Sequence, residues 1–417
     1  MPANAIVTEL LRAIQEEITG SVGEDLSGKE QRALRIGRMV AEMSLSEMLS
    51  ADEEEPVAVV CGCGDTAKSK ERESRTIVTM AGTHKIERRR YHCPSCGAWG
   101  APRDLLLGIG SGNYSAGVVA LTSEVAAGFP FEASEGFLAR RFGLDLCYKQ
   151  VQRIAERTGS VVSADELDMA RSVALDKVVV LSQERPKRLA VSADGLMVNS
   201  DGNWTEMKCA SFVSEEHGRS TIATMERAEK FGELLHLEAI RRGAANAEEL
   251  VFVADGAAWI WNLAAHHFPG AVEIVDWYHA TQHLWQIANT WYGDGTSKAR
   301  NWVKHNKVRL MEDGVDRVVS SIKQWNPTDE DGQKVKRENL HYFTTNARRM
   351  LYATYRELDY PIGSGSVESA CKQYGEGRLK QAGMRWKRPG IEAIAHLRSA
   401  LLNGRIDNIL GAARIAA

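Results

Sequence analysis

Two aspartates in this 417-residue chain each follow a short apolar run and precede a glycine, a pattern typical of a carboxylate at the end of a buried strand. Asp194 ends the run Leu189-Ala-Val-Ser-Ala, and Asp255 ends the run Leu250-Val-Phe-Val-Ala. Ligands bind at strand ends in α/β sheets. Neighbouring carboxylates repel unless a cation lies between them, and ligation by oxygen alone suits Mg²⁺ or Mn²⁺. The pair predicts a divalent-metal site, although Asp-Gly after a strand is also a common turn signal.

A glutamate far along the chain could supply a third ligand. Glu368 lies in Pro361-Ile-Gly-Ser-Gly-Ser-Val-Glu, where a glycine-rich turn leads into a predicted helix. Ser364 or Ser366 would cap that helix. Glu368 would then lie in the first turn, where the helix dipole favours a negative charge. Taken alone, the segment is an ordinary helix start.

A second acidic motif lies between these residues. Asp276 and His279, in Asp-Trp-Tyr-His, follow a further apolar run that predicts a strand. As an isolated pair they could be a helix cap and a buried histidine. Because they lie between Asp255 and Glu368 in the chain, we interpret them as part of the same site.

The elements that must position these residues follow the order β-β-β-α-β-α-β. Three strands in hairpin succession, followed by strands alternating with helices, imply a mixed sheet with helices on its faces. This is the element order of the ribonuclease-H-like fold, in which the first and fourth strands are neighbours, so Asp194 and Asp255 are expected to lie close together. Residues 280–355 read as helical and rich in tryptophan, and a last helix is predicted at residues 390–402.

Four of the seven cysteines lie close together in the sequence and predict a metal site rather than a disulfide framework. Cys61-Gly-Cys63-Gly and Cys93-Pro-Ser-Cys96-Gly resemble the two knuckles of a zinc ribbon, and four thiolates satisfy structural zinc. The first knuckle is shorter than the usual spacing, which leaves His84 or His92 open as a substitute ligand. The others are expected to be ordinary buried thiols: Cys147, Cys209 and Cys371.

Two stretches suggest contacts with nucleic acid. Residues 132–158 read as two helices broken at Gly143, and the second carries side chains suited to the major groove, namely Lys149, Gln150 and Arg153. Such helix pairs also occur in proteins that never meet DNA. A basic run, Arg88, Arg89 and Arg90, precedes the second cysteine knuckle, within the basic zone Lys68–Arg90 that follows the acidic stretch Asp52–Glu55. A second basic zone runs from Lys372 to Arg388.

The composition and charge exclude few classes of protein. The chain is 44% hydrophobic and 26% charged with a formal net charge of -3, typical of a soluble globular protein, so only a local basic surface could bind phosphate. No apolar run approaches the roughly 20 residues that span a bilayer. The first residues lack the pattern of a signal peptide and predict an amphipathic helix instead, with Ile6, Leu10, Leu11 and Ile14 on one face. A cytoplasmic protein is the default expectation.

Four runs together resemble a known family. VSADG, VADGAAWIW, VDWYH and GSGSVESACKQYGEGRLKQAGMRW resemble the DDE transposases of insertion sequences, most closely the ISKra-type group, which is related to the Mutator-like transposases. The resemblance covers roughly Lys187 to Asn403 and includes the distinctive Gly-Met-Arg-Trp tract, Gly383–Trp386. It implies that Asp194, Asp255 and Glu368 are the catalytic, metal-holding triad. Asp201, close to Asp194 in sequence, falls in a predicted hairpin turn and is not preferred.

The resemblance further implies that Asp276 and His279 match the family's Asp-x-x-His element and that the helical stretch after His279 matches its all-helical insertion. The implied chemistry is two-metal phosphoryl transfer, in which one ion activates a water or a 3′-hydroxyl and the other stabilises the leaving oxygen. His279 would orient the scissile phosphate. The DNA phosphates would be neutralised by Lys372, Arg378, Lys380 and Arg385.

The expected partners are double-stranded DNA, both terminal inverted repeats and target, and a second copy of the chain on that DNA in a bacterial cytoplasm. Two alternatives stay open: a ribonuclease-H-like nuclease without strand transfer, and a DNA-binding regulator derived from a transposase. The predicted organisation is as follows: an N-terminal helical segment (1–56), a zinc-ribbon-like region (57–105), a helix-turn-helix-like region (106–170), a ribonuclease-H-like core (171–279), a helical insertion (280–358) and the C-terminal part of the core (359–417).

Overall fold

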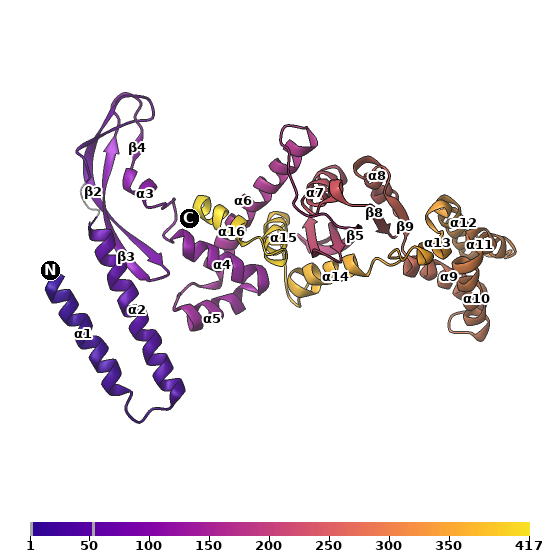
Figure 1. The fold of residues 1–417 in the computed structure, drawn as a ribbon, viewed down its shortest axis with the longest axis horizontal. Helices are drawn as coiled ribbons and strands as arrows, with labels where there is room; N and C mark the ends of the chain where they lie inside the picture. The colour runs from indigo at the N-terminus through magenta and orange to yellow at the C-terminus, as the bar shows by residue number, and fades with distance from the viewer. Residues whose placement is uncertain (1–2, 52–54) are drawn as a thin grey trace. The chain divides into compact units, whose positions relative to one another are not determined.

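The computed structural model describes residues 3–51 and 55–417, which form a mixed α/β protein. The chain divides into two compact units, one of residues 1–158 with 406–417 and one of residues 159–405 (Figure 1). Most of the predicted acidic stretch, residues 52–54, and the side chain of Ile6 lie outside the described residues. No helix within the described ranges has the length and apolar character needed to cross a membrane.

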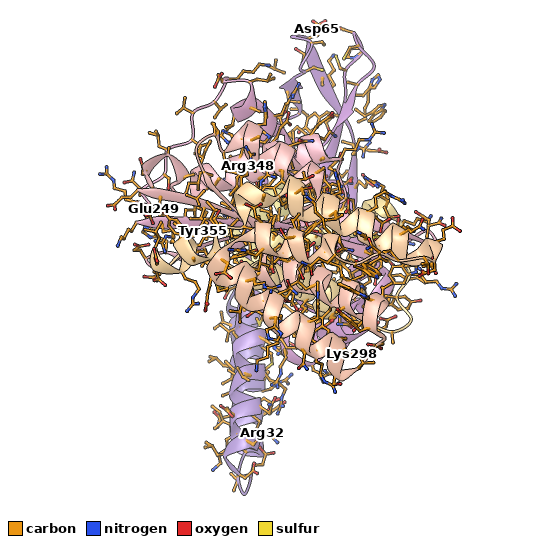
Figure 2. All side chains as sticks on the ribbon, turned by 90° about the vertical axis from the view of Figure 1, so that its right-hand side faces the viewer. Arg32, Asp65, Glu249, Lys298, Arg348 and Tyr355 are labelled. Carbon is orange, nitrogen blue, oxygen red and sulfur yellow. The ribbon has the colours of Figure 1, made fainter. Side chains whose placement is uncertain are left out.

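The first unit begins with the predicted helices, α1 (Ala3–Gly20) and α2 (Leu26–Ala51). They are joined by ion pairs in which the guanidinium of Arg32, on α2 (Figure 2), contacts Glu17 and Glu24, each at 2.8 Å. Leu10 and Ile14 are half-buried, as an amphipathic helix requires, whereas Leu11 is 61% exposed. Leu11 therefore does not share the covered face that the sequence predicted for it.

The cysteine-rich region forms a four-stranded antiparallel sheet with the order β1-β2-β3-β4. Its centre is a long hairpin of charged strands, which extends well beyond the short run predicted around Thr76. On β3, His84, Ile86 and Arg88 are buried and their neighbours are not, the alternation expected of a strand with one covered face. The elements are β1 (Ala58–Val60), β2 (Thr66–Thr79), β3 (Gly82–His92), β4 (Trp99–Gly100) and α3 (Pro102–Leu106).

Four helices complete this unit or lead out of it: α4 (Ala116–Gly128), α5 (Phe131–Phe142), α6 (Tyr148–Ala174) and α16 (Ile406–Ala416). The predicted break at Gly143 is confirmed, since this residue ends α5 with φ 68°, a conformation that glycine adopts freely. Helix α6 runs past the predicted domain boundary at residue 170. The last helix packs on α4, and the carbonyl of Ala417 accepts a hydrogen bond from the amide of Gly112 (2.8 Å).

This packing corrects one predicted boundary. Residues 406–417 were expected to belong with the C-terminal part of the catalytic core, but they belong to the first unit. The reason is that the small residues Ala412 and Ala413 bury one face of α16. Nothing in the sequence of α16 indicates which unit supplies the partner for that face.

The second unit is built on a five-stranded mixed sheet with the order β7-β6-β5-β8-β9. The first three strands are antiparallel neighbours, and β8 and β9 run parallel to β5, so the predicted mixed sheet is confirmed. The predicted hairpin turn falls at Asp201 and Gly202. The elements are β5 (Arg188–Ser200), β6 (Asn203–Ser214), β7 (Gly218–Thr224), α7 (Ala228–Arg241), β8 (Glu249–Ala254), α8 (Ala258–His267) and β9 (Val272–Val275).

The two faces of β5 have different roles. Leu189, Val191 and Ala193 belong to the main hydrophobic core, which includes buried residues of α7 and α8. Because successive side chains alternate across a strand, Ala190, Ser192 and Asp194 face the other side. Helix α14 (Gly365–Tyr374) packs on β5 and β6. The acidic side chain therefore lies on the face opposite the main core.

The region after β9 is helical, as predicted, and adds to the core of the sheet. Leu284, Val318 and Phe343 belong to the same buried cluster as Val191 and Phe252 of the strands. The elements are α9 (Trp277–Tyr292), α10 (Ser297–Val308), η2 (Arg309–Asp313), α11 (Val315–Lys323), α12 (Glu330–Thr345), η3 (Ala347–Arg349) and α13 (Tyr352–Glu357). After α14 come η4 (Gly375–Leu379) and the predicted last helix of the core, α15 (Arg388–Leu402).

Two helical glycines allow a matched test of this packing. A Cβ on Gly159 of α6 would lie 2.3 Å from the carbonyl oxygen of Ala393 in α15, whereas a Cβ on Gly411 of α16 would meet open space. We expect Gly159→Ala to lower the free energy of unfolding by about 1–3 kcal/mol, because backbone must move apart. Gly411→Ala should raise it by up to ~1 kcal/mol through helix propensity. Urea unfolding measures both; equal stability of the two variants would contradict the close α6–α15 contact.

Candidate metal and carboxylate sites

Asp194 lies inside a strand, not at the end of one as the sequence predicted. β5 continues to Ser200, and Asp194 is paired with Cys209 of β6. The parallel pairing of β5 with β8 ends at Ser192, opposite Val253. The carboxylate therefore lies just beyond the last pair of the parallel ladder. Gly195 provides space rather than a sharp exit, since a Cβ there would lie 2.4 Å from the Glu206 carboxylate.

Asp255 directly follows β8, as predicted. Its side chain accepts a hydrogen bond from the amide of Ala257 (2.8 Å), and its backbone carbonyl accepts one from the hydroxyl of Tyr342 (3.0 Å). Gly256 has φ 110°, and a Cβ on it would lie 2.7 Å from the Tyr342 ring. Glycine is therefore required both for the backbone conformation and for the approach of Tyr342.

The environment of the Asp194 carboxylate includes the charge of Asp255. Burial raises the pKa of Asp194 above its usual value, and the hydrogen bond from the Gly195 amide (2.7 Å) lowers it. The negative charge of Asp255 raises it further, and the charges of His279 and Asp276 act in opposite directions. These four residues thus form one charged cluster at the edge of the parallel strands, in which the ionised form of Asp194 is disfavoured.

Asp276 is buried and fully engaged in hydrogen bonds. It caps α9 by accepting the amides of Tyr278 and His279, the second at 2.9 Å. Its other oxygen accepts the amide of Ser364 (2.6 Å) and the Ser364 hydroxyl. The Trp277 amide also donates to the carbonyl of Ile362 (2.8 Å). Asp276 therefore fixes the segment that leads into α14, and its oxygens are already occupied.

Glu368 lies in the first turn of α14, as predicted. The expected capping hydrogen bond is absent at Ser364, because its hydroxyl donates to Asp276 instead. The Glu368 side chain is 64% exposed and forms an ion pair with Lys372 at 2.7 Å. Among the residues that the structure describes, the only group of three or more potential ligands within 4.8 Å of one another is a set of cysteines. Glu368 and the two aspartates do not form such a group.

The helical region supplies neighbours of Asp255 that sequence reasoning missed. His283 stacks on Tyr342 with 3.6 Å between ring centroids, and its Nδ1 lies 2.7 Å from the side-chain oxygen of Asn339. Burial lowers the pKa of His283 and raises that of Tyr342, and the charge of Asp255 adds to the second shift. His283 follows His279 by four residues, so the shared helix face was the one available sequence signal.

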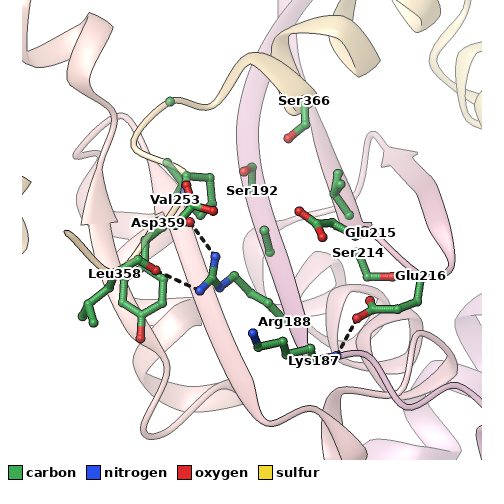
Figure 3. A pocket seen from close by; sticks show the side chains of 15 residues that line it. Lys187, Arg188, Ser192, Ser214, Glu215, Glu216, Val253, Leu358, Asp359 and Ser366 are labelled. Atoms are coloured by element: carbon green, nitrogen blue, oxygen red, sulfur yellow. Dashed lines mark hydrogen bonds between the residues drawn. The ribbon is translucent and has the colours of Figure 1, made fainter. Parts of the chain in front are cut away.

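A cavity of about 500 Å³ lies on the Asp194 side of the sheet. Figure 3 shows Ser192 of β5 and Ser366 of α14 at its wall, with Arg188 below them. The Arg188 guanidinium donates to the carbonyls of Asp359 (2.5 Å) and Leu358 (3.0 Å), which holds the segment before α14 in place. The cavity thus lies between the sheet and the segment that carries Glu368.

The cysteine cluster is formed by the four predicted cysteines. The sulfur atoms of Cys61 and Cys96 are 3.6 Å apart, as are those of Cys63 and Cys93, and all four lie within 4.8 Å of one another. Thiolates about 2.3 Å from one tetrahedral zinc ion lie about 3.8 Å apart. The cluster could therefore hold a structural metal such as zinc.

The two histidines considered as substitute ligands have other roles. His84 is buried with its Nδ1 3.0 Å from the Ser46 hydroxyl, and the His92 ring packs on Trp99 at 4.9 Å. Neither belongs to the group of close ligand atoms. The structure therefore favours the four-cysteine set.

The local electrostatics of the cluster suit a cation. Backbone amides, first that of Cys96, lower the pKa of Cys93 to about 7. An amide hydrogen bond at Asp65 also favours the Cys63 thiolate, but the neighbouring sulfurs outweigh it and raise the pKa of Cys63 to about 12. Four sulfurs this close cannot all ionise without a positive charge among them.

The arginine run before the second knuckle makes contacts within its own unit, and only Arg88 of the three is buried. Arg88 is buried and forms ion pairs with Asp104 and with Glu73, the latter at 3.1 Å. Arg90 lies 3.6 Å from the same Glu73 carboxylate and stacks over Trp99. The amide of Arg89 donates to Glu55 (2.6 Å), and its side chain is only half-exposed. These cations hold the hairpin together.

Two further predicted DNA contacts are engaged elsewhere. The Gln150 side chain accepts the Cys147 amide (2.9 Å) and donates to the Tyr114 hydroxyl (2.8 Å), so it caps α6 instead of facing a groove. Arg378 is fully buried, with its guanidinium 5.1 Å from the centre of the Trp386 ring. A side chain without exposed surface cannot reach a phosphate. The exposed members of the predicted set are Lys149, Arg153, Lys372, Lys380 and Arg385.

No family model matches the chain, and no curated protein matches it. The carboxylate cluster and the cysteine cluster therefore rest on their own geometry.

The cysteine cluster gives a direct prediction. We expect about one zinc per purified chain, retained in Cys147→Ser and lost in Cys96→Ser. Protons compete with zinc for thiolates, so binding should weaken as pH falls through the Cys93 pKa of about 7. Metal analysis after dialysis measures this. A protein that holds no zinc with all four cysteines intact would contradict the site.

The aspartate pair gives a second prediction. Because the folded-state pKa of Asp194 is raised, its protonated form stabilises the fold, and that stability is lost as pH rises through the raised pKa. At neutral pH, metal-free Asp194→Asn should melt at a higher temperature than the unsubstituted protein. Mn²⁺ should then stabilise the unsubstituted protein more than the variant, by up to about 2.7 kcal/mol at 100 times its Kd.

Asp201→Asn is the matched control, because Asp201 lies in the hairpin turn and away from the parallel strands. It should respond to Mn²⁺ as the unsubstituted protein does. Equal Mn²⁺ stabilisation of all three proteins would refute a metal site at Asp194.

Proposed function

We propose that this protein is a DDE transposase that uses Asp194, Asp255 and Glu368 to cut DNA strands at the ends of an insertion sequence and join them to a target. The observation that carries the proposal is that Asp194 and Asp255 each lie two residues beyond the last pair of the parallel strands β5 and β8, and that the charge of Asp255 acts on Asp194. Two carboxylates whose charges oppose each other at a strand edge are suited to a divalent cation.

The architecture of the second unit supports a ribonuclease-H-like catalytic domain. Three antiparallel strands are followed by two parallel ones in the order β7-β6-β5-β8-β9. A long helical region then separates β9 from α14, which carries Glu368 and packs on β5 and β6. In this proposal the helical region is the insertion that precedes the glutamate of the triad.

Glu368 is proposed as the third ligand despite its present partner. Its carboxylate is paired with Lys372 on the surface of α14, and exposed pairs of this kind are weak because solvent screens them. A divalent cation between the aspartates can therefore compete with the lysine for this carboxylate. Lys372, once released, is one helical turn away and free to neutralise a phosphate of the DNA.

The aspartate pair fits Mg²⁺ or Mn²⁺, since both side chains offer oxygen and burial penalises Asp194 when no cation is near. A bound ion of this kind would activate the attacking oxygen and stabilise the leaving one. The chain's own residues hold the geometry. Tyr342 and Gly256 fix Asp255, and Asp276 fixes the start of α14. His279, whose charge acts on Asp194, is proposed to donate to a phosphate oxygen.

The first unit is proposed to recognise the ends of the element. Lys149 and Arg153 on α6 are exposed and follow the turn at Gly143, an arrangement that supports contact with duplex DNA. The cysteine cluster would act as a zinc ribbon that stabilises the neighbouring hairpin. Because transposition joins two ends, the active species is proposed to be a homodimer on DNA.

Strand cleavage and transfer on a duplex that carries the inverted repeats flanking the gene, with Mg²⁺, would test the proposal. Asp255→Asn and Glu368→Gln should each reduce cleavage by more than the roughly 10–100-fold that removal of an outer hydrogen-bond partner of a metal ligand costs. Glu376→Gln, an exposed glutamate just beyond α14, is the matched control and should leave cleavage unchanged.

Near-normal cleavage by Asp255→Asn would refute the proposed triad. Cleavage without joining to a target plasmid would identify a nuclease, and binding without cleavage a regulator.

A further inference from the structure

One helix of the second unit carries positive charge without any carboxylate partner. From Ser297 to Met311 the chain has five lysines and arginines and no aspartate or glutamate. Four of the five are exposed and Lys307 is half-buried; Lys298 is visible at the surface of its helix in Figure 2. The set, called the α10 cations below, consists of four residues of α10 and the residue that directly follows it: Lys298, Arg300, Lys304, Lys307 and Arg309.

The α10 cations occupy a stretch without carboxylates, whereas some exposed lysines on other helices of the same unit pair with a glutamate one turn away. Examples are Lys230 with Glu226 (3.2 Å) and Lys372 with Glu368 (2.7 Å). Among the described residues, none of the α10 cations forms an ion pair with a carboxylate. The nearest acidic residues in sequence, Asp294 and Glu312, lie outside the helix.

This charge opposes the stability of the helix. Lys298 and Arg300 lie in the first turn, where the helix dipole favours anions and no acidic residue is present. Arg300, Lys304 and Lys307 follow one another at i, i+4 and i+7, and each like-charged pair costs about 0.2–0.5 kcal/mol. The helix is held by its Thr296 cap and by the buried residues of its inner face instead.

The inner and outer faces of α10 are clearly divided. Ala299, Val303 and Asn306 are buried, so the helix is fixed to its unit and its cations are held on a rigid element. The row from Arg300 to Lys307 spans about 10 Å at 1.5 Å per residue. Duplex DNA carries about one phosphate per 1.7 Å of its axis, so a row of this length faces several phosphates at once.

We infer that the outer face of α10 is a binding surface for the phosphodiester backbone of duplex DNA, in addition to the contacts proposed for α6 and α14. The choice of duplex DNA as the polyanion rests on the proposed function, whereas the preference for an anionic partner rests on the charge of this face alone. The surface reads no sequence, because phosphate contacts position a protein on DNA without distinguishing bases. It holds the DNA against the unit that contains Asp194 and Asp255.

The test compares two triple variants that remove the same charge. One is Arg300→Ala/Lys304→Ala/Lys307→Ala. The control removes three exposed cations of the same unit that already have carboxylate partners, Lys230→Ala/Lys334→Ala/Arg348→Ala. All proteins also carry Asp255→Asn, so that no cleavage takes place. Binding to a labelled duplex of arbitrary sequence is followed by fluorescence anisotropy between about 50 and about 200 mM salt.

The logarithm of the affinity decreases linearly as the logarithm of the salt concentration rises. The steepness of this line should decrease by about 0.9 for each phosphate that the protein no longer neutralises. We therefore expect a decrease of about 2–3 in the α10 variant, with affinity weakened roughly tenfold or more. The control should keep the slope of the parent protein. Thermal unfolding of the α10 variant should be no earlier than that of the parent, because its substitutions lie on the outer face of the helix.

An unchanged slope in the α10 variant would overturn the inference, as would an equal decrease in the control, which would assign the effect to net charge. A parent protein that does not bind duplex DNA would overturn it as well. A different outcome would refute the proposed function without refuting this inference. Salt-dependent binding through α10 without cleavage by the protein with Asp255 intact would refute the transposase and leave the surface standing.

Discussion

The buried carboxylate of Asp276 connects the parts on which the rest of the second unit depends. It caps α9 at the end of β9 and, through Ser364, holds the start of α14. The 87 residues between Asp276 and Ser364 also pack against the sheet, as at Tyr342, but both of their ends are held at this contact. Bringing together the ends of so long a segment has an entropic cost, which the hydrogen bonds that fix both ends offset. The Asp276 contact therefore sets the position of α14 relative to the strands that carry the aspartates.

Much of this fold could be predicted from local patterns. Apolar runs such as Leu189-Ala-Val-Ser-Ala identified β5 and β8, and the polar turn at Asp201 identified the hairpin. Buried strands and tight turns can be recognised in this way because both depend on the types of residues next to one another in the sequence. The length of β5 was underestimated, since Asp194 interrupts the apolar pattern without ending the strand. The pairing of α16 with α4 could not be predicted, because a short amphipathic helix does not specify its partner.

The candidate site, like the fold, could be predicted from the sequence only in part. The two aspartates were found because each follows an apolar run in the sequence, whereas Tyr342 and His283 approach from helices whose place depends on tertiary packing. The predictions that the structure does not bear out concern charged and polar side chains. Arg88, Gln150 and Arg378 have the chemistry of DNA contacts, but the structure engages them internally. Sequence shows that a side chain is charged or polar; only the fold shows whether a partner already neutralises it.

The return of α16 to the first unit has a consequence for how the protein is made. On the ribosome α4 emerges well before its partner α16, because the whole second unit lies between them in the chain. Domains generally fold in the order of their synthesis, but this unit cannot complete its core until α16 has been synthesised. An apolar face of α4 therefore waits uncovered while the second unit folds, and a message that stops before residue 406 yields an N-terminal region that never closes.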